Sequence, residues 1–263
     1  MDLNKVLSQL QEKSPLVHNI TNYVTMNNTA NALLSIGASP VMAHAVEEVE
    51  EMVKISSALV INIGTLSPHW VQAMIKAGIA AKENNIPVIF DPVGVGATSY
   101  RNEVAKTILQ ECKPDIVRGN ASEILSLVKS NVKTKGVDST IAVDNVVSSA
   151  KDLANDLNTV VVVSGETDYI TDGSKSAFIE NGSPMMIKVT GMGCTATAIV
   201  AAFAGTLKNP FDAGVAGMAV MGVAGELAAK KSEGPGSLQL IFLDTLHNLN
   251  KMDLNSLLKI RNE

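Results

Sequence analysis

The hydrophobic positions of the chain alternate between short, continuously apolar runs and longer segments in which apolar residues recur every three or four positions. The short runs predict strands at residues 16–19, 40–42, 58–63, 88–90, 115–117, 159–163 and 175–179. Runs such as ALVINI and TVVVV are apolar almost throughout, which is typical of strands covered on both faces of a parallel sheet.

The periodic segments predict helices between these strands. They lie at residues 22–36, 101–111, 121–129 and 146–157, and almost throughout 194–258. Gly37 supplies a helix C-cap, and Ser67 followed by Pro68 predicts the start of a further helix. Segment 169–189 predicts an antiparallel hairpin that turns at Asp172 and Gly173. The alternation of strands and helices indicates an α/β fold with a mostly parallel sheet and right-handed crossovers.

Length and charge narrow the possible partners. The 263 residues suit one large domain or two small ones. The chain carries 26 acidic and 21 basic residues, a formal net charge of −5, and its one adjacent basic pair is Lys230–Lys231. Because nucleic-acid binding needs clustered basic residues, this balance argues against a nucleic-acid partner. Aromatic residues make up only 3%, so we expect an aliphatic core.

Cysteine usage and the apolar segments argue against disulfides and membrane spans. Two cysteines, Cys112 and Cys194, are too few for a secreted disulfide scaffold. The chain also lacks a CxxC motif, which argues against a cysteine-based zinc site. The N-terminal residues are amphipathic and lack the apolar region of a signal peptide. The uncharged stretch 189–207 has the length of a bilayer span, but its threonines and glycines favour a buried core helix. We therefore expect a cytoplasmic protein without a membrane partner.

In an open α/β sheet ligands gather where parallel strands end, so polar residues at those positions are candidates for chemistry. Asp91 ends a buried strand, where a carboxylate is costly unless it meets a cation or a donor. Mg²⁺ takes such oxygen ligands and keeps several waters. After another strand come Arg118, Asn120 and Glu123, a set that suits phosphate plus metal. Helix capping is the alternative role for Glu123.

Other strand ends carry residues whose role the sequence leaves open. Ser164 suggests a phosphate or ribose contact, or only a β-turn. Asn22 either caps the following helix or touches a ligand, and Gly64 either lets a ligand approach the backbone or serves a turn. Met42 follows a short strand and lines either an apolar pocket or the core. For His18, a hydrogen-bonded histidine at a strand end is favoured over a catalytic one.

The segment VTGMGCTATA predicts an anion-binding helix N-terminus. Gly191 and Gly193 precede a helix that starts near Cys194, and free N–H groups at such a start bind anions. With Ala196 the spacing also fits a dinucleotide fingerprint, but Asn209–Pro210 signals a helix where that motif needs a strand. Cys194 is either a small buried hydrophobe or a thiol facing the anion, and the helix N-terminus is expected to favour its thiolate.

The motifs FDPVGVGATSYR, RGNASEI, VVSGETD and VTGMGCTATA, in this order and spacing, closely resemble the hydroxyethylthiazole kinase family of thiamin salvage. The likeness runs from HNITN to GPGS at residues 234–237 and covers nearly the whole chain. It implies one ribokinase-like domain over residues 1–263, a three-layer sandwich with helices on both faces of the sheet. It also implies a homotrimer with sites at subunit interfaces. The reaction implied is Mg²⁺-dependent transfer of the γ-phosphoryl group of ATP to the hydroxyl of 4-methyl-5-(2-hydroxyethyl)thiazole.

The resemblance further implies roles for individual residues. Asp91 and Glu123 match the family's magnesium region, and Arg118 and Ser164 match its ATP contacts. Met42 and Gly191 match its substrate contacts. The lining of the thiazole pocket is matched by Asn22, Val24 and Gly64. Cys194 matches the residue that stands where the wider ribokinase-like superfamily has an Asp base. The N–H groups of Gly191, Met192, Gly193 and Cys194 are expected to hold the transferring phosphoryl group.

Two other functions compete with this one. One is a different ribokinase-like activity, such as a pyrimidine kinase or a hydrate dehydratase. Cys194 in place of Asp and the HNITN opening disfavour it. The other is a nucleotide-binding regulator without turnover, which the presence of Asp91, Glu123 and Arg118 disfavours. ATP consumption that depends on the thiazole alcohol distinguishes all three.

Overall fold

The computed structural model describes residues 1–131 and 143–263, whose nine strands form one sheet in the order β2-β1-β3-β4-β5-β6-β7-β8-β9. The strands are β1 (Leu16–Ile20), β2 (Ser39–Val41), β3 (Ala58–Asn62), β4 (Val88–Asp91), β5 (Ile116–Asn120), β6 (Val160–Ser164), β7 (Asp168–Thr171), β8 (Ser176–Ile179) and β9 (Ile260–Asn262). Strands β1 to β6 are parallel to one another, and β7 to β9 are added antiparallel after β6. Six strands therefore end at the same edge of the sheet.

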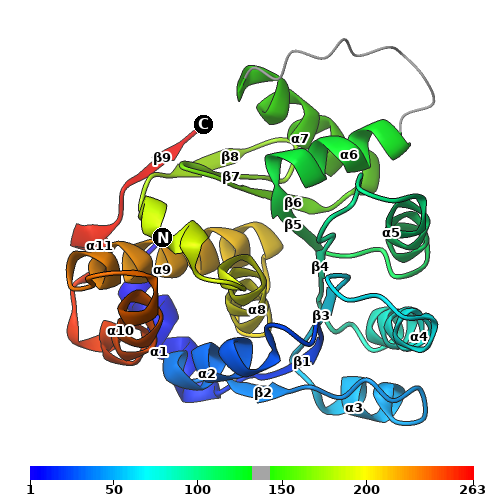
Figure 1. Cartoon of the computed structure of the whole chain (residues 1–263), viewed down its shortest axis with the longest axis horizontal. Coiled ribbons are helices and arrows are strands. Elements are labelled where there is room, and N and C mark those ends of the chain that lie inside the picture. Colours follow the sequence, from blue (N-terminus) through cyan, green and yellow to red (C-terminus); the bar gives the residue numbers. More distant parts are fainter. Residues whose placement is uncertain (132–142) are drawn as a thin grey trace.

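Helices cover both faces of this sheet, which gives three layers (Figure 1). One face carries α3 (Val49–Ile55), α4 (Pro68–Glu83), α5 (Ser99–Glu111), α6 (Ala121–Asn131) and α7 (Val143–Leu157). On the other face α8 (Met192–Ala204) and α9 (Pro210–Lys230) pack against the strands, with α1 (Leu3–Lys13), α2 (Met26–Ile36), α10 (Pro235–Asn248) and α11 (Leu254–Leu257) around them. The mostly parallel, doubly covered sheet confirms the predicted α/β class.

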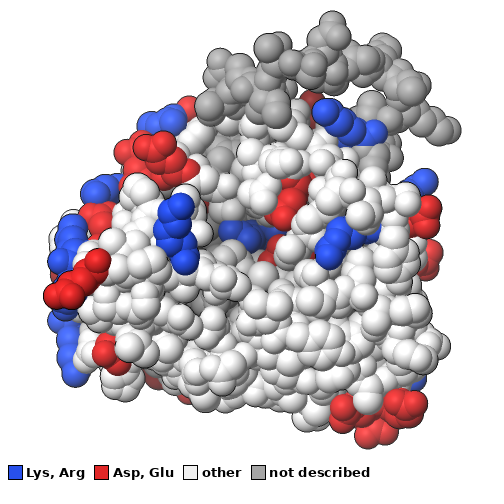
Figure 2. All heavy atoms as spheres, viewed as in Figure 1, with Lys and Arg blue, Asp and Glu red and all other residues white. Residues whose placement is uncertain are grey.

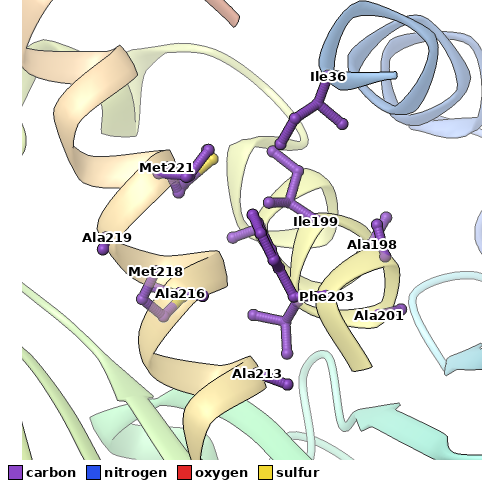
Figure 3. Close-up of a cluster of buried hydrophobic side chains, with 14 of the residues drawn as sticks. Ile36, Ala198, Ile199, Ala201, Phe203, Ala213, Ala216, Met218, Ala219 and Met221 are labelled. Atoms are coloured by element: carbon purple, nitrogen blue, oxygen red, sulfur yellow. The ribbon is translucent and has the colours of Figure 1, made fainter. Parts of the chain in front are cut away.

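Helix α8 is held firmly by its packing against α9. A Cβ atom on Gly217 of α9 would lie 2.6 Å from Cγ2 and 2.7 Å from Cα of Val200, so only glycine permits this approach. In Figure 3, the side chains of Ile199 and Phe203 on α8 lie between the two helices and face α9, which carries Met221. All three side chains are buried. The first turn of α8, which carries Cys194, therefore starts from a rigid core element.

Most predicted elements are confirmed, and three details are wrong. The helix predicted from residue 22 begins at Met26, because Asn22 uses its side chain in the site instead of capping the helix. The predicted hairpin turns at Asp172 and Gly173, where Gly173 has φ +91°, but its second strand ends at Ile179. A 3₁₀ helix at Pro184–Lys188 takes the place of its expected continuation. The sequence pattern did not predict β9 at all.

The apolar helices are core elements. The uncharged stretch 189–207 forms α8, in which every residue from Thr195 to Ala204 is buried, so the predicted core helix is confirmed. In the described part of the chain, only α9 is long and apolar enough to cross a membrane. Most of α9 is buried inside the fold, which is typical of the central helix of a globular domain.

Candidate active site

Polar residues converge where the parallel strands end. The residues concerned are Asn22 after β1, Asn62 at the end of β3, Asp91 at the end of β4, Arg118 and Asn120 in β5, and Ser164 at the end of β6. The first turn of α8 reaches the same edge, since Asn22 Nδ2 donates to Sγ of Cys194 over 3.3 Å. The face shown in Figure 2 is hollowed near its middle, where acidic and basic side chains lie together.

A chain of hydrogen bonds joins the ends of β1, β3 and β4. Asn62 Nδ2 donates to Oδ2 of Asp91 over 2.8 Å. Asn62 Oδ1 accepts from Asn22 Nδ2 at 3.0 Å and from the Gly64 N–H at 2.9 Å. A Cβ atom on Gly64 would lie 2.7 Å from Asn22 Nδ2, so glycine is required for Asn22 to sit here. Asn22, Gly64, Asp91 and Cys194 are thus brought together at one edge of the sheet.

Asp91 is a buried carboxylate, with 1% of its surface exposed. Burial raises the pKa of Asp91 to about 6, against the favourable charge of Arg118 and the hydrogen bonds from Thr197 and Asn62, which lower it. Both side-chain donors, Thr197 Oγ1 at 2.7 Å and Asn62 Nδ2, bind the same oxygen, Oδ2. Within the described chain Oδ1 accepts no hydrogen bond, so this oxygen is free for a cation or a water.

Helix α8 begins with a tight turn that leaves N–H groups free. Gly191 has φ +86°, and a Cβ atom there would lie 2.6 Å from Cγ2 of Thr25. The first N–H to bond back into this helix is that of Thr195, to the Gly191 carbonyl at 2.8 Å. The N–H groups of Gly193 and Cys194 find no acceptor among the described residues, which suits an anion site. The Met192 N–H, which was also expected to hold the anion, donates instead to the Val189 carbonyl at 3.5 Å and is not free.

The expectation of a Cys194 thiolate is wrong. Burial, and next the negative charge of Asp91, raise the pKa of Cys194 above its ordinary value of 9.0. The hydrogen bond from Asn22 and the charge of Arg118 oppose this but do not reverse it. The sequence showed the helix N-terminus but neither the depth of burial nor the neighbouring carboxylate. Cys194 is therefore a protonated thiol near neutral pH.

Arg118 carries its charge into the same space. Its exposed fraction is 7%, and Nη2 donates to Oγ of Ser164 over 2.5 Å. Its Nε is buried without a partner, and the described residues offer the guanidinium no ion pair within 4 Å. A Cβ atom on Gly193 would lie 2.8 Å from Nη1. A buried guanidinium with unused donors, against the free N–H groups of α8, favours an anion between them.

Glu123 caps the helix that carries it. Its Oε2 accepts the Asn120 N–H at 2.8 Å, and its own N–H donates to Asn120 Oδ1 at 3.0 Å. This reciprocal pair is a capping box, so the capping alternative is confirmed. Oε1 accepts the Gly94 N–H at 2.9 Å and so ties the loop after β4 to α6. A metal-binding role for Glu123 stays a prediction beside these contacts.

Two predicted substrate residues lie away from the hydrogen-bonded cluster. Met42 follows the edge strand β2 and is half-buried, and Val24 is 63% exposed. Neither residue has a hydrogen bond that links it to Asn22 or Cys194. Their place at the rim leaves them accessible to a ligand or to a second chain.

Sequence reasoning missed two residues that hold Asp91. Asn62 lies in the run ALVINI. An amide near the end of this otherwise apolar strand could have indicated a residue of the site. Thr197 lies one helical turn after Gly193 and Cys194, on the face that the first turn presents to the sheet. Only the fold shows that its hydroxyl meets β4.

The donor set fits a magnesium ion that is held mainly by phosphates and water. No group of three or more His, Cys, Asp or Glu residues within 1–131 and 143–263 forms a metal cage. Mg²⁺ is commonly bound by one or two carboxylates plus substrate phosphates. The free Oδ1 of the buried Asp91 meets that requirement, with Glu123 one loop away.

A separate cavity lies at the opposite edge of the sheet. It measures about 470 Å³ and is lined by residues that precede β3, β4 and β5, among them Ser57, Pro87 and Asp115. Lys82 and Asp115 in its wall pair with each other at 3.0 Å. Lys208 also lines this cavity, which is remote from the strand ends that carry Asp91 and Arg118.

Comparisons with known proteins agree with this geometry. A sequence model of the hydroxyethylthiazole kinase family matches residues 7–252. The chain is 57% identical to a hydroxyethylthiazole kinase of Leptospira biflexa over 93% of its own length and 91% of that protein. The solved structure of a hydroxyethylthiazole kinase from Pyrococcus horikoshii superposes with a TM-score of 0.93 at 38% identity, covering 99% of this chain and 98% of that one.

A more distant structure concerns the fold alone. A ribokinase-like superfamily protein from Enterococcus faecalis superposes with a TM-score of 0.66 at 13% identity, covering 93% of this chain and 88% of that chain. The ribokinase-like architecture predicted from the sequence is therefore confirmed.

Proposed function

The chain belongs to the hydroxyethylthiazole kinase family, and from this premise we propose that it transfers the γ-phosphoryl group of ATP to the hydroxyl of 4-methyl-5-(2-hydroxyethyl)thiazole in thiamin salvage. The observation that carries the proposal is the meeting of Asp91, Arg118 and the first turn of α8 at one point. A carboxylate for a cation, a guanidinium and free N–H groups are the parts that phosphoryl transfer requires.

The residues that bind the phosphates of ATP are Arg118, Ser164 and the turn formed by Gly191, Met192, Gly193 and Cys194. The unused guanidinium donors of Arg118 bind ATP phosphates, with Ser164 Oγ fixing the guanidinium. The free N–H groups of Gly193 and Cys194 in this turn point at the oxygens of the transferring group, where they stabilise developing charge. Asp91 Oδ1, with Glu123 beyond it, would hold Mg²⁺. When bound, this ion neutralises phosphate charge.

In the reaction the hydroxyl oxygen of the thiazole alcohol bonds to the γ-phosphorus, and the bond from that phosphorus to the bridging oxygen of ADP breaks. The hydroxyl proton leaves to a base or to water. Cys194 lies at the head of the α8 turn and is the candidate acceptor, but its raised pKa keeps the thiol mostly protonated near neutral pH. A loose transition state demands little of a base, so Cys194 assists rather than dominates.

We propose further that the active form is a cytoplasmic homotrimer of this single kinase domain, with the thiazole bound at subunit interfaces. Met42 and Val24 stand at the rim, while Asn22 and Gly64 form the inner wall. Exposed apolar side chains on neighbouring elements support an interface, namely Leu34 on α2, Ile187 on the 3₁₀ helix and Leu240 on α10. Closed symmetric rings are the usual outcome of such self-association.

The deciding experiment measures ADP release by the purified chain with Mg²⁺ and ATP, with and without the thiazole alcohol. The proposal expects release that depends on the alcohol and yields its phosphate ester. Release with a pyrimidine or pyridoxal substrate instead would point to another ribokinase-like kinase. ATP binding without any release would point to a regulator.

The metal assignment has its own test. Glu123→Gln should lower turnover strongly and raise the Mg²⁺ concentration for half-maximal rate, while the fold survives. Its carbonyl oxygen can still accept one of the two backbone N–H bonds. Wild-type rates at limiting Mg²⁺ would reject a metal role for Glu123.

A further inference from the structure

The guanidinium of Arg101 binds three backbone carbonyls from two loops of the site. Nη1 donates to the carbonyl of Ile63 at 2.5 Å and to that of Val93 at 2.6 Å. Nη2 donates to the carbonyl of Gly64 at 2.9 Å. Ile63 and Gly64 follow β3, and Val93 follows β4, so one side chain joins the loops after two neighbouring strands.

Helix preference does not explain a cation at this position. Arg101 lies in the first turn of α5, where its N–H donates to the capping hydroxyl of Thr98. The positive end of the helix dipole disfavours a cation there. The described residues give Arg101 no ion pair either. The carbonyl bonds are thus the interactions that hold the charge in place.

The two loops flank the residues that hold Asp91. Immediately before Ile63, Asn62 donates to Asp91, and the Gly64 N–H binds Asn62 in return. Val93 lies two residues after Asp91, and its N–H bonds to the Asp91 carbonyl at 2.9 Å. Arg101 therefore fixes the backbone on the outer side of both Asn62 and Asp91.

The same side chain supports the contact to Glu123. A Cβ atom on Gly94 would lie 3.4 Å from Cδ and from Nε of Arg101, so the side chain packs beneath this glycine. The Gly94 N–H donates to Oε1 of Glu123. The ends of β3 and β4 and the start of α6 are thus linked through Arg101 and its immediate neighbours.

We propose that Arg101 is a positioning residue for this kinase reaction: it sets the distance between the thiazole-pocket loop at Gly64 and the Asp91–Gly94 loop that faces the phosphates. This inference rests on the proposed function. Arg101 touches neither substrate and acts through the backbone that it binds. A planar fork with several donors suits three converging carbonyls, and a lysine ammonium cannot reproduce that geometry.

The test compares Arg101→Ala and Arg101→Lys with Lys106→Ala. Lys106 is an exposed cation on the same helix, so its loss changes the charge of α5 equally and leaves the loops alone. We expect Arg101→Ala to lose ~10²-fold in kcat, the scale expected when reacting groups shift by about 1 Å. The Mg²⁺ concentration for half-maximal rate and the KM for the alcohol should rise. Arg101→Lys should recover little, and millimolar guanidinium should partly restore Arg101→Ala alone.

Calorimetric binding of Mg-ATP and of the alcohol supplies a readout that needs no turnover. Both Kd values should weaken in the two Arg101 variants and stay at the wild-type values in Lys106→Ala. If the wild type binds the ligands without transferring phosphate, the proposed function fails while these Kd values still decide the role of Arg101. If Arg101→Ala does not fold, Arg101→Lys decides it.

A folded Arg101→Ala with wild-type kcat, Mg²⁺ requirement and Kd values would overturn the proposal. The proposal would also be overturned if the kcat of Arg101→Ala, expressed per folded molecule, equals that of the wild type and its KM is unchanged. That result would show that Arg101 has a purely structural role. Thermal unfolding of each variant provides the folded fraction.

Discussion

The hydroxyl of Thr197 donates to Oδ2 of Asp91 over 2.7 Å and joins the core helix α8 to the end of strand β4. Both side chains are almost fully buried. The Gly193 carbonyl lies 3.3 Å from the same hydroxyl, one turn back along the helix. A hydroxyl has one proton, and the carboxylate is the nearer and the stronger acceptor. Thr197 therefore fixes the position of the free N–H groups of α8 relative to the carboxylate.

Replacing Thr197 by valine should test this link with little change in volume. Thr197→Val removes a hydrogen bond to a buried charge, so we expect a loss of about 1.5–3 kcal/mol in the free energy of unfolding at pH 7. The pKa of Asp91 should rise above about 6, because the Thr197 bond lowers it. The measurement is urea unfolding together with kcat.

Thr29→Val is the matched control for this substitution. The Thr29 hydroxyl is buried in α2 without a hydrogen-bond partner in the described structure. Valine there removes an unsatisfied polar group, so stability should hold or rise. Equal losses in the two variants would show that the Thr197–Asp91 bond contributes nothing specific.

Continuous apolar runs such as those of β3 and β6 were sufficient to predict parallel strands, because a strand covered on both faces buries side chains of both orientations. Strand β9 was not predicted because it is only three residues long, Ile260–Asn262, and all three residues are exposed. Its existence depends on pairing with β8, far back in the sequence. No local pattern contains that information.

The site was predictable where residues stand in motifs and unpredictable where the fold alone joins them. Asp91 could be predicted because it is a charged residue at the end of an apolar strand. Gly191 could be predicted because it is a glycine just before a helix. Arg101 is the last residue of a recognised motif, yet its three carbonyl partners come from two loops. The direction of the Cys194 pKa depends on burial and on Asp91, neither of which the sequence displays.

Asp168 should make the protein less stable as the pH rises through the acidic range. Burial raises the pKa of Asp168 to about 6 from 3.8, although its Oδ1 accepts the Gly165 N–H at 3.1 Å. The folded state then binds the proton more tightly than the unfolded state. The stabilisation is complete below pH 3.8 and is lost as the pH rises through about 6, by about 3 kcal/mol at 1.36 kcal/mol per pKa unit.

Asp168→Asn isolates this contribution, since Asp91 shifts in the same direction. Urea unfolding of the metal-free protein from pH 4 to 7 should show a smaller decline in the free energy of unfolding for Asp168→Asn than for the wild type. Asp244→Asn, an exposed carboxylate on α10, should follow the wild-type curve. Parallel curves for all three proteins would contradict a buried, proton-binding Asp168.

The proposed trimer should separate when its apolar surface is charged. Ile187 is 81% exposed and Leu240 68%, on the 3₁₀ helix and on α10, which touch each other. The double variant Ile187→Glu/Leu240→Glu should behave as a monomer of 27.7 kDa in light scattering and lose thiazole phosphorylation. Ile79→Glu, on α4 across the sheet, should leave the trimer intact. An active monomeric wild type would reject the interface.

Cys194 should be an assisting base whose contribution grows with pH. Because burial and Asp91 raise the pKa of the thiol, the wild-type kcat should increase toward alkaline pH as the thiolate forms. Cys194→Asp places a group with a far lower pKa at the same point, so activity near neutral pH should persist or rise and the alkaline increase should vanish. Steady-state turnover across pH 6 to about 9.5 measures both effects.

Cys194→Ala separates the thiol from the backbone beside it. The variant keeps the Cys194 N–H that helps to form the anion site and loses only the proton acceptor. General-base catalysis typically contributes ~10²–10⁴-fold, and the loss here should fall at the low end because the thiol is mostly protonated in the first place. Unfolding curves check that each variant keeps its fold. Complete inactivity of both the alanine and the aspartate variants, or a phosphocysteine trapped during wild-type turnover, would refute the assisting role.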